Sequence, residues 1–516
     1  MMITAAVETK GNSKILPLQD LARVVAELQE AGKVVVQCHG VFDLMHIGHI
    51  RHFESAKKLG DVLIVTVTPD RYVNKGPNRP VFTEAHRAAS IGALACVDYV
   101  AINQWPMATD TIRLLRPNIF AKGSEYRDAS KDRTGAISAE EQVIEEIGGR
   151  LAFTDDVVFS SSTLLNHHFG IFPERTEQFL ARFSAEHNAR ETIRWLEEAR
   201  GLKVLVLGEA IIDEYQYCET IGKSGKEPVL VARHMTTERF PGGIVAVANH
   251  AAAISEQVTM LTCLGRMDSH EDFIVNQTKP KVEKLFHYLD EAPTIIKRRF
   301  VENYPLQKLF EVYVMGDIDQ HAAQSAAIRE HLAAILPRFD AVIVADYGHG
   351  MMTPEVIWTV CQHARFLAVN TQVNAGNHGF NTVSKYARAD YISISERELR
   401  LEARRPRGEL DEIVVEVANR LSCERMMITR GDKGCLCYSR QEGFVEVPAF
   451  TGRVVDRVGA GDAVLAVTAL CAARQAPMEI TGFIGSCVGA MAVAVVGNRD
   501  SVEGVPLQRY IECILK

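Results

Sequence analysis

The sequence predicts two α/β domains, each built on a mostly parallel sheet, and three observations support this fold class. The chain has 516 residues, which is too long for one ordinary domain. Its hydrophobic fraction of 47% and charged fraction of 24% allow a large packed core. Short apolar runs alternate with helical patterns from Val34 onward, stop near Phe172, and resume at Lys203.

The first alternation predicts an N-terminal domain over residues 1–172. Strand and helix patterns follow one another, beginning with a strand, in the order KVVVQCHG, HIGHIRHFESAKKLG, DVLIVTVT, EAHRAASIGALA, VDYVAI, ATDTIRLLR and NIFAKG. Strands that alternate with helices form parallel sheets with right-handed crossovers. The N-terminal domain is therefore expected to hold a parallel sheet covered by helices.

Residues 173–202 are charged, amphipathic and without strand patterns, so we expect a helical connector there. Over residues 203–516 the alternation predicts a second, larger α/β domain. Within it, Thr481–Gly497 carries no charged side chain. Because crossing a bilayer takes about 20 apolar residues, this shorter segment is expected to be a buried helix.

Charge and cysteine usage limit the partners and the cellular compartment that we expect for the protein. The net charge of −8 is spread without a basic stripe, so a nucleic-acid partner is not expected. Eleven cysteines occur without CxxC pairs, which is typical of reduced thiols in a cytoplasm. The N-terminus lacks the pattern of a signal peptide. We expect a cytoplasmic protein that does not bind a membrane.

The stretch HGVFDLMHIGH, residues 39–49, follows a predicted strand and leads into a predicted helix, a setting that suits phosphate binding. It fits the pattern G-x-F-D-x-x-H-x-G-H at Gly40, Phe42, Asp43, His46, Gly48 and His49. Gly48 lets a nucleotide approach the backbone, and the two imidazoles can donate hydrogen bonds to triphosphate oxygens. A zinc ion bound by both histidines and Asp43 is the competing interpretation.

A second glycine-rich turn lies in RVVDRVGAGDAVLA, residues 453–466. Gly459, Ala460 and Gly461 open a predicted helix, so their backbone N–H groups can point at a migrating phosphoryl group. Asp462 is then placed to accept the proton of an attacking hydroxyl. An aspartate in such a turn is also a common helix cap, which is the alternative interpretation.

Residues 13–170 resemble the cytidylyltransferase-like nucleotidyltransferases. The stretches NRPVFTEAHRAASIGALACVDYV, LRPNIFAKGSEYRD and DDVVFSSSTLLN are similar to the nucleotidyltransferase half of the bifunctional heptose-phosphate kinases/nucleotidyltransferases. The resemblance implies a Rossmann-like fold in which Arg87, together with Ser161, Ser162 and Thr163, contacts the nucleotide. It further suggests that Lys57 faces the phosphates and that Lys122 holds the sugar phosphate, although both could be ordinary solvated lysines.

Residues 200–516 resemble the ribokinase-like (PfkB) sugar kinases. The resemblance rests on the glycine-rich turn with Asp462 and on the stretches GEAIIDEY, FPGGIVAVANHAA and MITRGDKG. Within the family, it is closest to the heptose kinases through the stretch APTIIKRRFVENYPLQKLFE. It implies a ribokinase-like α/β domain in which the sugar-binding residues are Asp213, Gly242, Gly243 and Asn249. It likewise assigns Thr429 and Gly431 to the ATP site and Glu398 to the metal.

The sequence departs from the family pattern in three places and in its domain order. Glu209 stands where the family usually has an aspartate after the first strand, and VNTQVNAGNHGFN replaces an aspartate-proline turn. In the element SERE, Ser395 replaces the usual asparagine while Glu398 is kept. The heptose enzymes carry the kinase first, whereas this chain carries it second.

Together these features predict a bifunctional enzyme that phosphorylates a sugar, such as a heptose phosphate, at the anomeric oxygen and joins a sugar 1-phosphate to a nucleotide. The resemblance implies ATP and Mg²⁺, sugar phosphates and nucleotides as small-molecule partners, and a homo-oligomer, a dimer. CTP with a polyol or other sugar phosphate is the alternative at the first site. A third hypothesis makes the kinase half a degenerate sugar-binding or dimerisation module.

Overall fold

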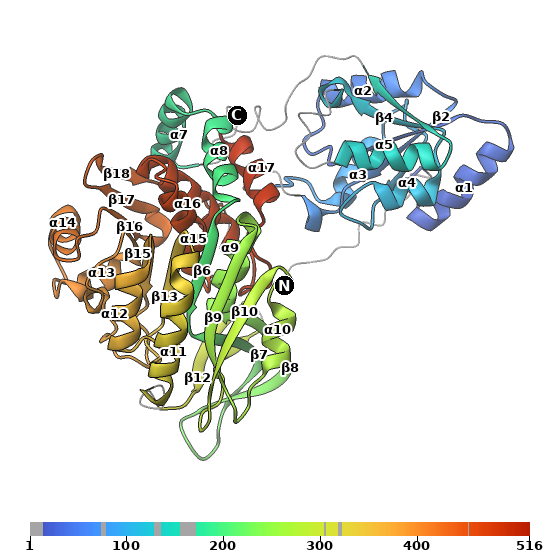
Figure 1. Cartoon of the computed structure of the whole chain (residues 1–516). Coiled ribbons are helices and arrows are strands. Elements are labelled where there is room, and N and C mark those ends of the chain that lie inside the picture. The colour runs from blue at the N-terminus through green and yellow to red at the C-terminus, as the bar shows by residue number, and fades with distance from the viewer. Residues whose placement is uncertain are drawn as a thin grey trace. The chain divides into compact units, whose positions relative to one another are not determined.

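The computed structural model describes residues 14–73, 79–127, 136–154, 172–303, 306–317, 322–452 and 454–516. The chain divides into two compact units, which we call unit 1 (Met1–Ile171) and unit 2 (Phe172–Leu515) (Figure 1). Each is an α/β fold and is described by itself.

Unit 1 holds a five-stranded parallel sheet in the order β3-β2-β1-β4-β5. Its strands are β1 Val35–Gly40, β2 Val62–Val67, β3 Tyr99–Ile102, β4 Ile119–Gly123 and β5 Arg150–Thr154. Its helices are α1 Leu18–Glu30, α2 Ile47–Lys57, α3 Glu84–Gly92, α4 Thr109–Leu115 and α5 Ala136–Glu146. The predicted alternation is confirmed. Because the strand order reverses direction between β1 and β4, the carboxyl ends of these two strands form the crevice where such sheets bind ligands.

The large sheet of unit 2 has nine strands in the order β10-β9-β6-β13-β14-β15-β16-β17-β18, parallel from β10 through β16 and antiparallel at its last two pairings. The strands are β6 Lys203–Gly208, β9 Gln257–Gly265, β10 Val282–Leu289, β13 Ala341–Asp346, β14 Leu367–Thr371, β15 Tyr391–Ser395, β16 Arg425–Thr429, β17 Cys435–Ser439 and β18 Gly443–Val447. Its order reverses between β6 and β13, which again marks the expected ligand crevice.

A second sheet of unit 2, which we call the small sheet, has four strands in the order β12-β11-β7-β8. They are β7 Ala210–Lys223, β8 Leu230–Gly243, β11 Ile295–Glu302 and β12 Gln307–Val314. Strand β7 starts two residues after β6 ends, so the small sheet begins at the carboxyl edge of the large one. In Figure 1 the labelled strands β7, β8 and β12 lie together, below most of the helices of unit 2.

Helices pack on both faces of the large sheet and enclose two hydrophobic cores. One core includes residues of α7 Glu174–Glu186, α8 Ala189–Ala199, α9 Ile244–Ile254, α10 Glu271–Gln277, α15 Ala460–Ala473, α16 Met478–Ala492 and α17 Gly504–Ile514. The other includes residues of α11 Ala322–Ile335, α12 Pro354–His363, α13 Glu396–Glu402 and α14 Leu410–Arg420. The segment expected as a connector thus forms α7 and α8, whose buried Phe183 and Leu196 pack into unit 2.

The apolar segment Thr481–Gly497, predicted to be a buried helix, lies for the most part in the buried helix α16, which ends at Ala492. Across the described parts of the chain, no helix combines the length and the apolar character needed to cross a bilayer. All eleven cysteines are free thiols.

Candidate active sites

In unit 1 two histidine rings are stacked where the chain enters helix α2. His46 is the N-cap of this helix, and its Nδ1 accepts a hydrogen bond from the backbone N–H of Gly48 at 3.1 Å. The ring centroids of His46 and His49 are 3.9 Å apart, with the ring planes at 22°. The buried ring of Phe42 meets His49 edge-on at 5.6 Å and supports it. A Cβ at Gly40 would lie 2.9 Å from this Phe42 ring, so glycine is required there.

Asp43 holds a neighbouring loop. Its two carboxylate oxygens accept hydrogen bonds from the backbone N–H groups of Val81, at 2.8 Å, and Phe82, at 3.1 Å. The zinc interpretation is not supported, because in the described part of the chain the ligand atoms of Asp43 do not converge with those of the two histidines. Among the residues that the structure describes, three such atoms converge only at Glu186, His187 and Glu479 in unit 2.

Arg87 lies behind the histidine turn and is 2% exposed. Its guanidinium donates four hydrogen bonds, to the carbonyl oxygens of Val41, Thr68 and Phe82 and to the carboxylate of Asp70. These bonds join the loops that follow β1 and β2 to helix α3. Arg87 is thus a buried residue that holds these loops in place, and its contact with the nucleotide stays a prediction.

Lys57 does not lie at the site. It is the last residue of α2, so it sits about 16 Å of helix away from the N-cap. Its ammonium pairs with Asp98 at 2.5 Å and donates to the carbonyl of Asp61 at 2.6 Å. These partners hold the ammonium at the end of α2 away from the histidine turn, and the contact of Lys57 with the phosphates stays a prediction. The serine-threonine turn of Ser161, Ser162 and Thr163 lies outside the described residues.

Two groups at the carboxyl edge of the sheet complete the surroundings of the histidine turn. His39, which the sequence motif does not include, bonds to the hydroxyls of Thr66 at 2.9 Å and Thr68 at 3.3 Å. Burial, aided by the charge of Lys122, lowers the pKa of His39 to about 3, so its imidazole is neutral at pH 7. The ammonium of Lys122 pairs with the buried carboxylate of Glu140 at 2.7 Å.

In unit 2 the glycine-rich turn opens helix α15. Gly459 is its N-cap with φ of +79°, and a Cβ there would collide with the buried side chain of Asn498. Asp462 lies in the first turn, where its carboxylate accepts a hydrogen bond from the hydroxyl of Tyr347 at 2.9 Å. Burial raises the pKa of Asp462 to about 7; the Tyr347 bond opposes this rise, and the charge of Asp213 adds to it. A carboxylate with this pKa is suited to proton transfer near neutral pH.

Asp213 faces the same region from strand β7. Its carboxylate is paired with the guanidinium of Arg299 on β11, which also pairs with Glu311 at 2.9 Å. Gly242 lies directly against Asp213, because a Cβ there would be 2.4 Å from a carboxylate oxygen. Gly243 has a φ of +55° and faces the carbonyl of residue 209.

Lys297 is two residues before Arg299 on the same face of strand β11 and is 5% exposed. Its ammonium lies 5.2 Å from the ring centroid of Tyr313 and 5.7 Å from that of Tyr347. Burial lowers its pKa, while the charges of Asp213 and Asp462 oppose this shift. Sequence reasoning did not assign it a role, although the alternation in IIKRRFVE places Lys297 and Arg299 on one face of the strand.

Glu209, which departs from the family pattern, fixes the loop that carries Tyr347. Its two carboxylate oxygens accept hydrogen bonds from the backbone N–H groups of Tyr347 and His349, both at 3.1 Å. Strands β6 and β13 are neighbours, so this carboxylate bridges the crevice between their carboxyl ends.

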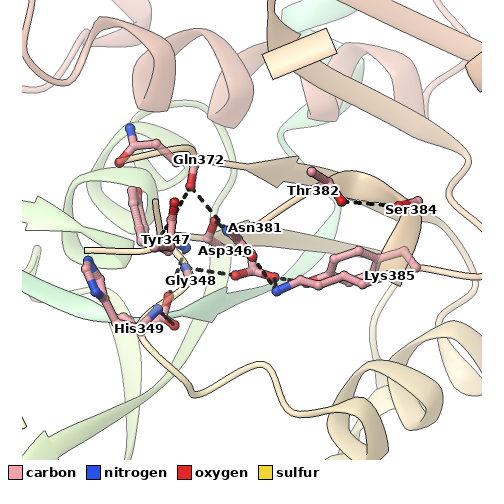
Figure 2. A network of polar contacts seen from close by, with 12 residues as sticks. Asp346, Tyr347, Gly348, His349, Gln372, Asn381, Thr382, Ser384 and Lys385 are labelled. Atoms are coloured by element: carbon pink, nitrogen blue, oxygen red, sulfur yellow. Dashed lines mark hydrogen bonds and ion pairs between the residues drawn. The ribbon is translucent and has the colours of Figure 1, made fainter. Parts of the chain in front are cut away.

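The segment VNTQVNAGNHGFN supports the same loop from the other side. Asn374 and Asn377 donate to the carbonyl of Tyr347 at 2.7 and 3.1 Å, and Asn381 donates to that of Asp346 at 2.8 Å. Figure 2 shows Asn381 and the ammonium of Lys385 converging on Asp346. A cavity of about 820 Å³ opens beside this network. The segment that replaces the aspartate-proline turn of the family therefore supports the loop that carries Tyr347.

Glu398 and Ser395 form a capping box at the start of α13. The oxygens of Glu398 accept hydrogen bonds from the backbone N–H groups of Ser395 at 2.8 Å and Val373 at 3.0 Å. No cationic side chain among the described residues pairs with Glu398, so its remaining lone pairs can bind a divalent cation. Thr429 ends strand β16, and Gly431 follows it with a φ of +61°.

The side chain of Asn249 is hydrogen-bonded to the backbone of a neighbouring turn. Its amide donates to the carbonyl of Gln277 at 2.8 Å and accepts from the backbone N–H of Lys279 at 2.9 Å. Both ends of the side chain therefore hold this turn, and the contact of Asn249 with a sugar stays a prediction.

Two sequence profiles of known families match the chain, one over each unit. The sequence profile described as pfkB family carbohydrate kinase matches residues 202–504, more than half of the chain. The protein belongs to the pfkB family of carbohydrate kinases. A second profile, described as cytidylyltransferase-like, matches residues 38–167 in unit 1. The pfkB kinase unit therefore follows a nucleotidyltransferase-like unit in one chain.

Curated relatives of this pfkB protein are named bifunctional protein HldE. That of Desulfatibacillum aliphaticivorans is 36% identical over 153 residues, 29% of this chain and 30% of that protein. That of Citrifermentans bemidjiense is 26% identical over 315 residues, 60% of this chain and 63% of that protein. The chain thus spans about a third of the first relative.

Among solved structures, phosphofructokinase-2 from Escherichia coli in complex with potassium superposes with a TM-score of 0.50. It is 16% identical and covers 61% of this chain and all of that chain. This similarity concerns the fold, which is ribokinase-like in unit 2.

Proposed function

We propose that the protein is a bifunctional enzyme. Unit 2 phosphorylates the anomeric oxygen of a heptose phosphate with ATP. Unit 1 joins a sugar 1-phosphate to a nucleotide and releases pyrophosphate. The observation that carries this proposal is that one chain has two turns suited to phosphate binding, each beside side chains that can act in catalysis. These side chains are Asp462 at α15 and the stacked histidines at α2. The names of the HldE relatives support the pairing.

In the kinase reaction Asp462 accepts the proton of the sugar hydroxyl. The sugar oxygen then forms a bond to the γ-phosphorus of ATP while the bond to the β-phosphate oxygen breaks, and ADP leaves. Backbone N–H groups at the start of α15 donate to the phosphoryl oxygens. Asp213 and the Gly242–Gly243 backbone bind the sugar, and Thr429 and Gly431 line the ATP site. Glu398 would hold Mg²⁺, which would supply positive charge to offset that of the phosphates.

In the transferase reaction an oxygen of the sugar 1-phosphate attacks the α-phosphorus of a nucleoside triphosphate. One P–O bond forms, the bond to the pyrophosphate leaving group breaks, and no covalent enzyme intermediate is needed. His46 and His49 donate hydrogen bonds to the phosphate oxygens as negative charge grows on them. The crevice between β1 and β4 receives the nucleotide.

The test follows the two products separately. For the transferase, the protein is incubated with ATP or CTP and either heptose 1-phosphate or glycerol phosphate, and pyrophosphate release is measured. For the kinase, it is incubated with ATP and heptose phosphates, and ADP release is measured. ATP-dependent pyrophosphate release with heptose 1-phosphate supports the proposal. Release only with CTP and glycerol phosphate supports the alternative that unit 1 is a cytidylyltransferase, which its cytidylyltransferase-like profile also favours.

We further propose that the protein is a homodimer joined through the small sheet. Exposed apolar side chains gather on its strands, namely Ile221, Leu230, Val231, Met235, Phe310 and Val312. A second copy of the sheet would cover them. Light scattering should give twice the chain mass, and Phe310→Glu should halve it; a monomeric wild type contradicts the dimer.

A further inference from the structure

Lys297 is a buried cation whose ammonium has only aromatic rings as close partners among the described residues. It makes no hydrogen bond or ion pair to any described residue, although 95% of its surface is covered (5% exposed). An ammonium group has three donors, and burying them unpaired costs free energy. A site that retains such a group is prepared for a ligand that supplies acceptor atoms.

The other cations around the site are already neutralised. Arg299 is paired with Asp213 and Glu311, and Lys308 with the buried Asp456 at 2.8 Å. Lys385 is paired with Asp346 at 2.5 Å. Within the described part of unit 2, Lys297 is thus a buried basic side chain at this crevice whose charge is not paired with a carboxylate.

The carboxylates near Lys297 are also engaged. Glu209 accepts from two backbone N–H groups, Asp213 from Arg299, and Asp462 from the hydroxyl of Tyr347. The charges that act on Lys297 come from Asp213, Arg299, Asp462 and Glu209. With Glu398 these carboxylates oppose the approach of an anionic phosphate, and a free ammonium among them offsets that repulsion.

The position of Lys297 fits the path of the transferred group. It pairs in register with Asp213 on β7, on the acceptor side, and its neighbour Tyr347 is hydrogen-bonded to the base Asp462. The transferring phosphoryl group must lie between the acceptor oxygen and the start of α15. Backbone N–H groups at the start of α15 can reach it, and Lys297 on β11 lies close enough to Asp462 to be affected by its charge.

We propose that Lys297 is a catalytic residue that contacts the phosphoryl group during its transfer from ATP to the sugar; this rests on the kinase function proposed above. Its ammonium donates to an equatorial phosphoryl oxygen as the new O–P bond forms and the bond to ADP breaks. It gains no covalent bond and gives up no proton. Because negative charge on these oxygens must be held in the transition state, the effect appears in kcat.

The test compares Lys297→Met with wild type in the full-length protein, measuring ADP release with a phosphorylated heptose and with the same heptose unphosphorylated. We expect kcat to fall by about 10²–10³-fold with both acceptors, the range for losing one preorganised donor, while KM for each stays within about threefold. Lys284→Met, on β10, is the matched control and should leave both constants unchanged. Thermal unfolding establishes that each variant is folded.

A second variant separates a catalytic from a structural role. Lys297→Ala should regain part of its kcat when ethylammonium is added, since a small cation can enter the space left by the side chain, and ethylammonium should not stimulate wild type. A rise in KM confined to the phosphorylated heptose would overturn the proposal and make Lys297 an anchor for the acceptor. Unchanged kcat would overturn it as well, with the kinase function intact. A wild type that releases no ADP with any acceptor overturns both.

Discussion

The site of unit 1 is built around one contiguous turn, whereas the site of unit 2 gathers side chains from segments far apart in the sequence. In unit 1, Gly40 through His49 supply the turn, and distant residues such as Arg87 hold it from behind. In unit 2, Asp462 meets Tyr347, and Lys297 lies beside Asp213. A contiguous site can be located from a motif, but a convergent site depends on how the sheets pair.

The two sites also differ in charge. Unit 1 presents imidazoles, and burial keeps His39 neutral with a pKa of about 3. Unit 2 brings several carboxylates together, and burial with the neighbouring charge of Asp213 raises the pKa of Asp462 to about 7. The first arrangement suits donation of hydrogen bonds to phosphate, and the second suits removal of a proton. Substitutions in one unit should therefore leave the chemistry of the other unchanged.

The largest effect is expected from Asp462→Asn. The amide can still accept the hydrogen bond from Tyr347 but cannot take a proton, so ADP release should fall by about 10²–10⁴-fold. Pyrophosphate release by unit 1 should stay at the wild-type rate. Equal loss of both activities would contradict the separation of the two sites.

The raised pKa of Asp462 predicts the sign of two pH effects. In wild type, kcat/KM for the kinase should rise with pH up to about 7 and then level off, because the ionised carboxylate is the base. The folded-state pKa lies above the ordinary value of 3.8, so ionisation destabilises the fold as pH rises from about 4 to 7. Asp462→Asn should thus melt higher than wild type at pH 8, and the difference should vanish near pH 4.

His49→Ala should affect only unit 1. Loss of one preorganised donor to the phosphates should lower pyrophosphate release by about 10²–10³-fold. His86→Ala is the matched control, because the exposed imidazole of His86 bonds to Thr83, the N-cap of α3. If His49→Ala kept the wild-type rate, the stacked histidines would not be the phosphate donors.

Arg87→Met tests the scaffold of unit 1. It leaves three carbonyl oxygens and the partly exposed Asp70 carboxylate without their donor, and leaving a buried acceptor unsatisfied costs about 1–3 kcal/mol. Hydrogen exchange should accelerate in α3 and β2 and stay unchanged in unit 2. Faster exchange throughout the chain would indicate that the units are not independently stable.

Much of the fold follows from local pattern, because alternating strands and helices restrict the topology to a few parallel sheets. The sequence also located Asp462 and the two histidines, whose turns are contiguous. It could not assign Lys297, since its proximity to Asp213 comes from the pairing of β7 with β11. Nor could it show that the amide of Asn249, which can bind a sugar, also holds the turn at Gln277.

Glu209→Asp should have a moderate effect on the kinase. The shorter side chain cannot reach both N–H groups that Glu209 binds at 3.1 Å, so the loop that carries Tyr347 loosens. Because the Tyr347 hydrogen bond opposes the rise in the pKa of Asp462, a weaker bond moves the rising limb of the kinase pH profile to higher pH. We expect about a tenfold loss at pH 6.5 and less at pH 8.5, corresponding to about 1.4 kcal/mol at the lower pH. A uniform loss at both pH values would place the effect in substrate binding.

The smallest effect is expected from Lys57→Met, which tests the difference between a residue near a motif in sequence and one near the site in space. Lys57 ends α2, and its partners are Asp98 and the carbonyl of Asp61. A partly exposed ion pair of this kind contributes about 0–1 kcal/mol, so the melting temperature should change little. Because the ammonium lies at the far end of α2 from the histidines, kcat and KM for pyrophosphate release should stay within about twofold of wild type, against the loss of 10²-fold or more expected for His49→Ala. A rise in KM for the nucleoside triphosphate, with the fold intact, would mean that the phosphates reach along the helix, and would restore the role that the sequence suggested.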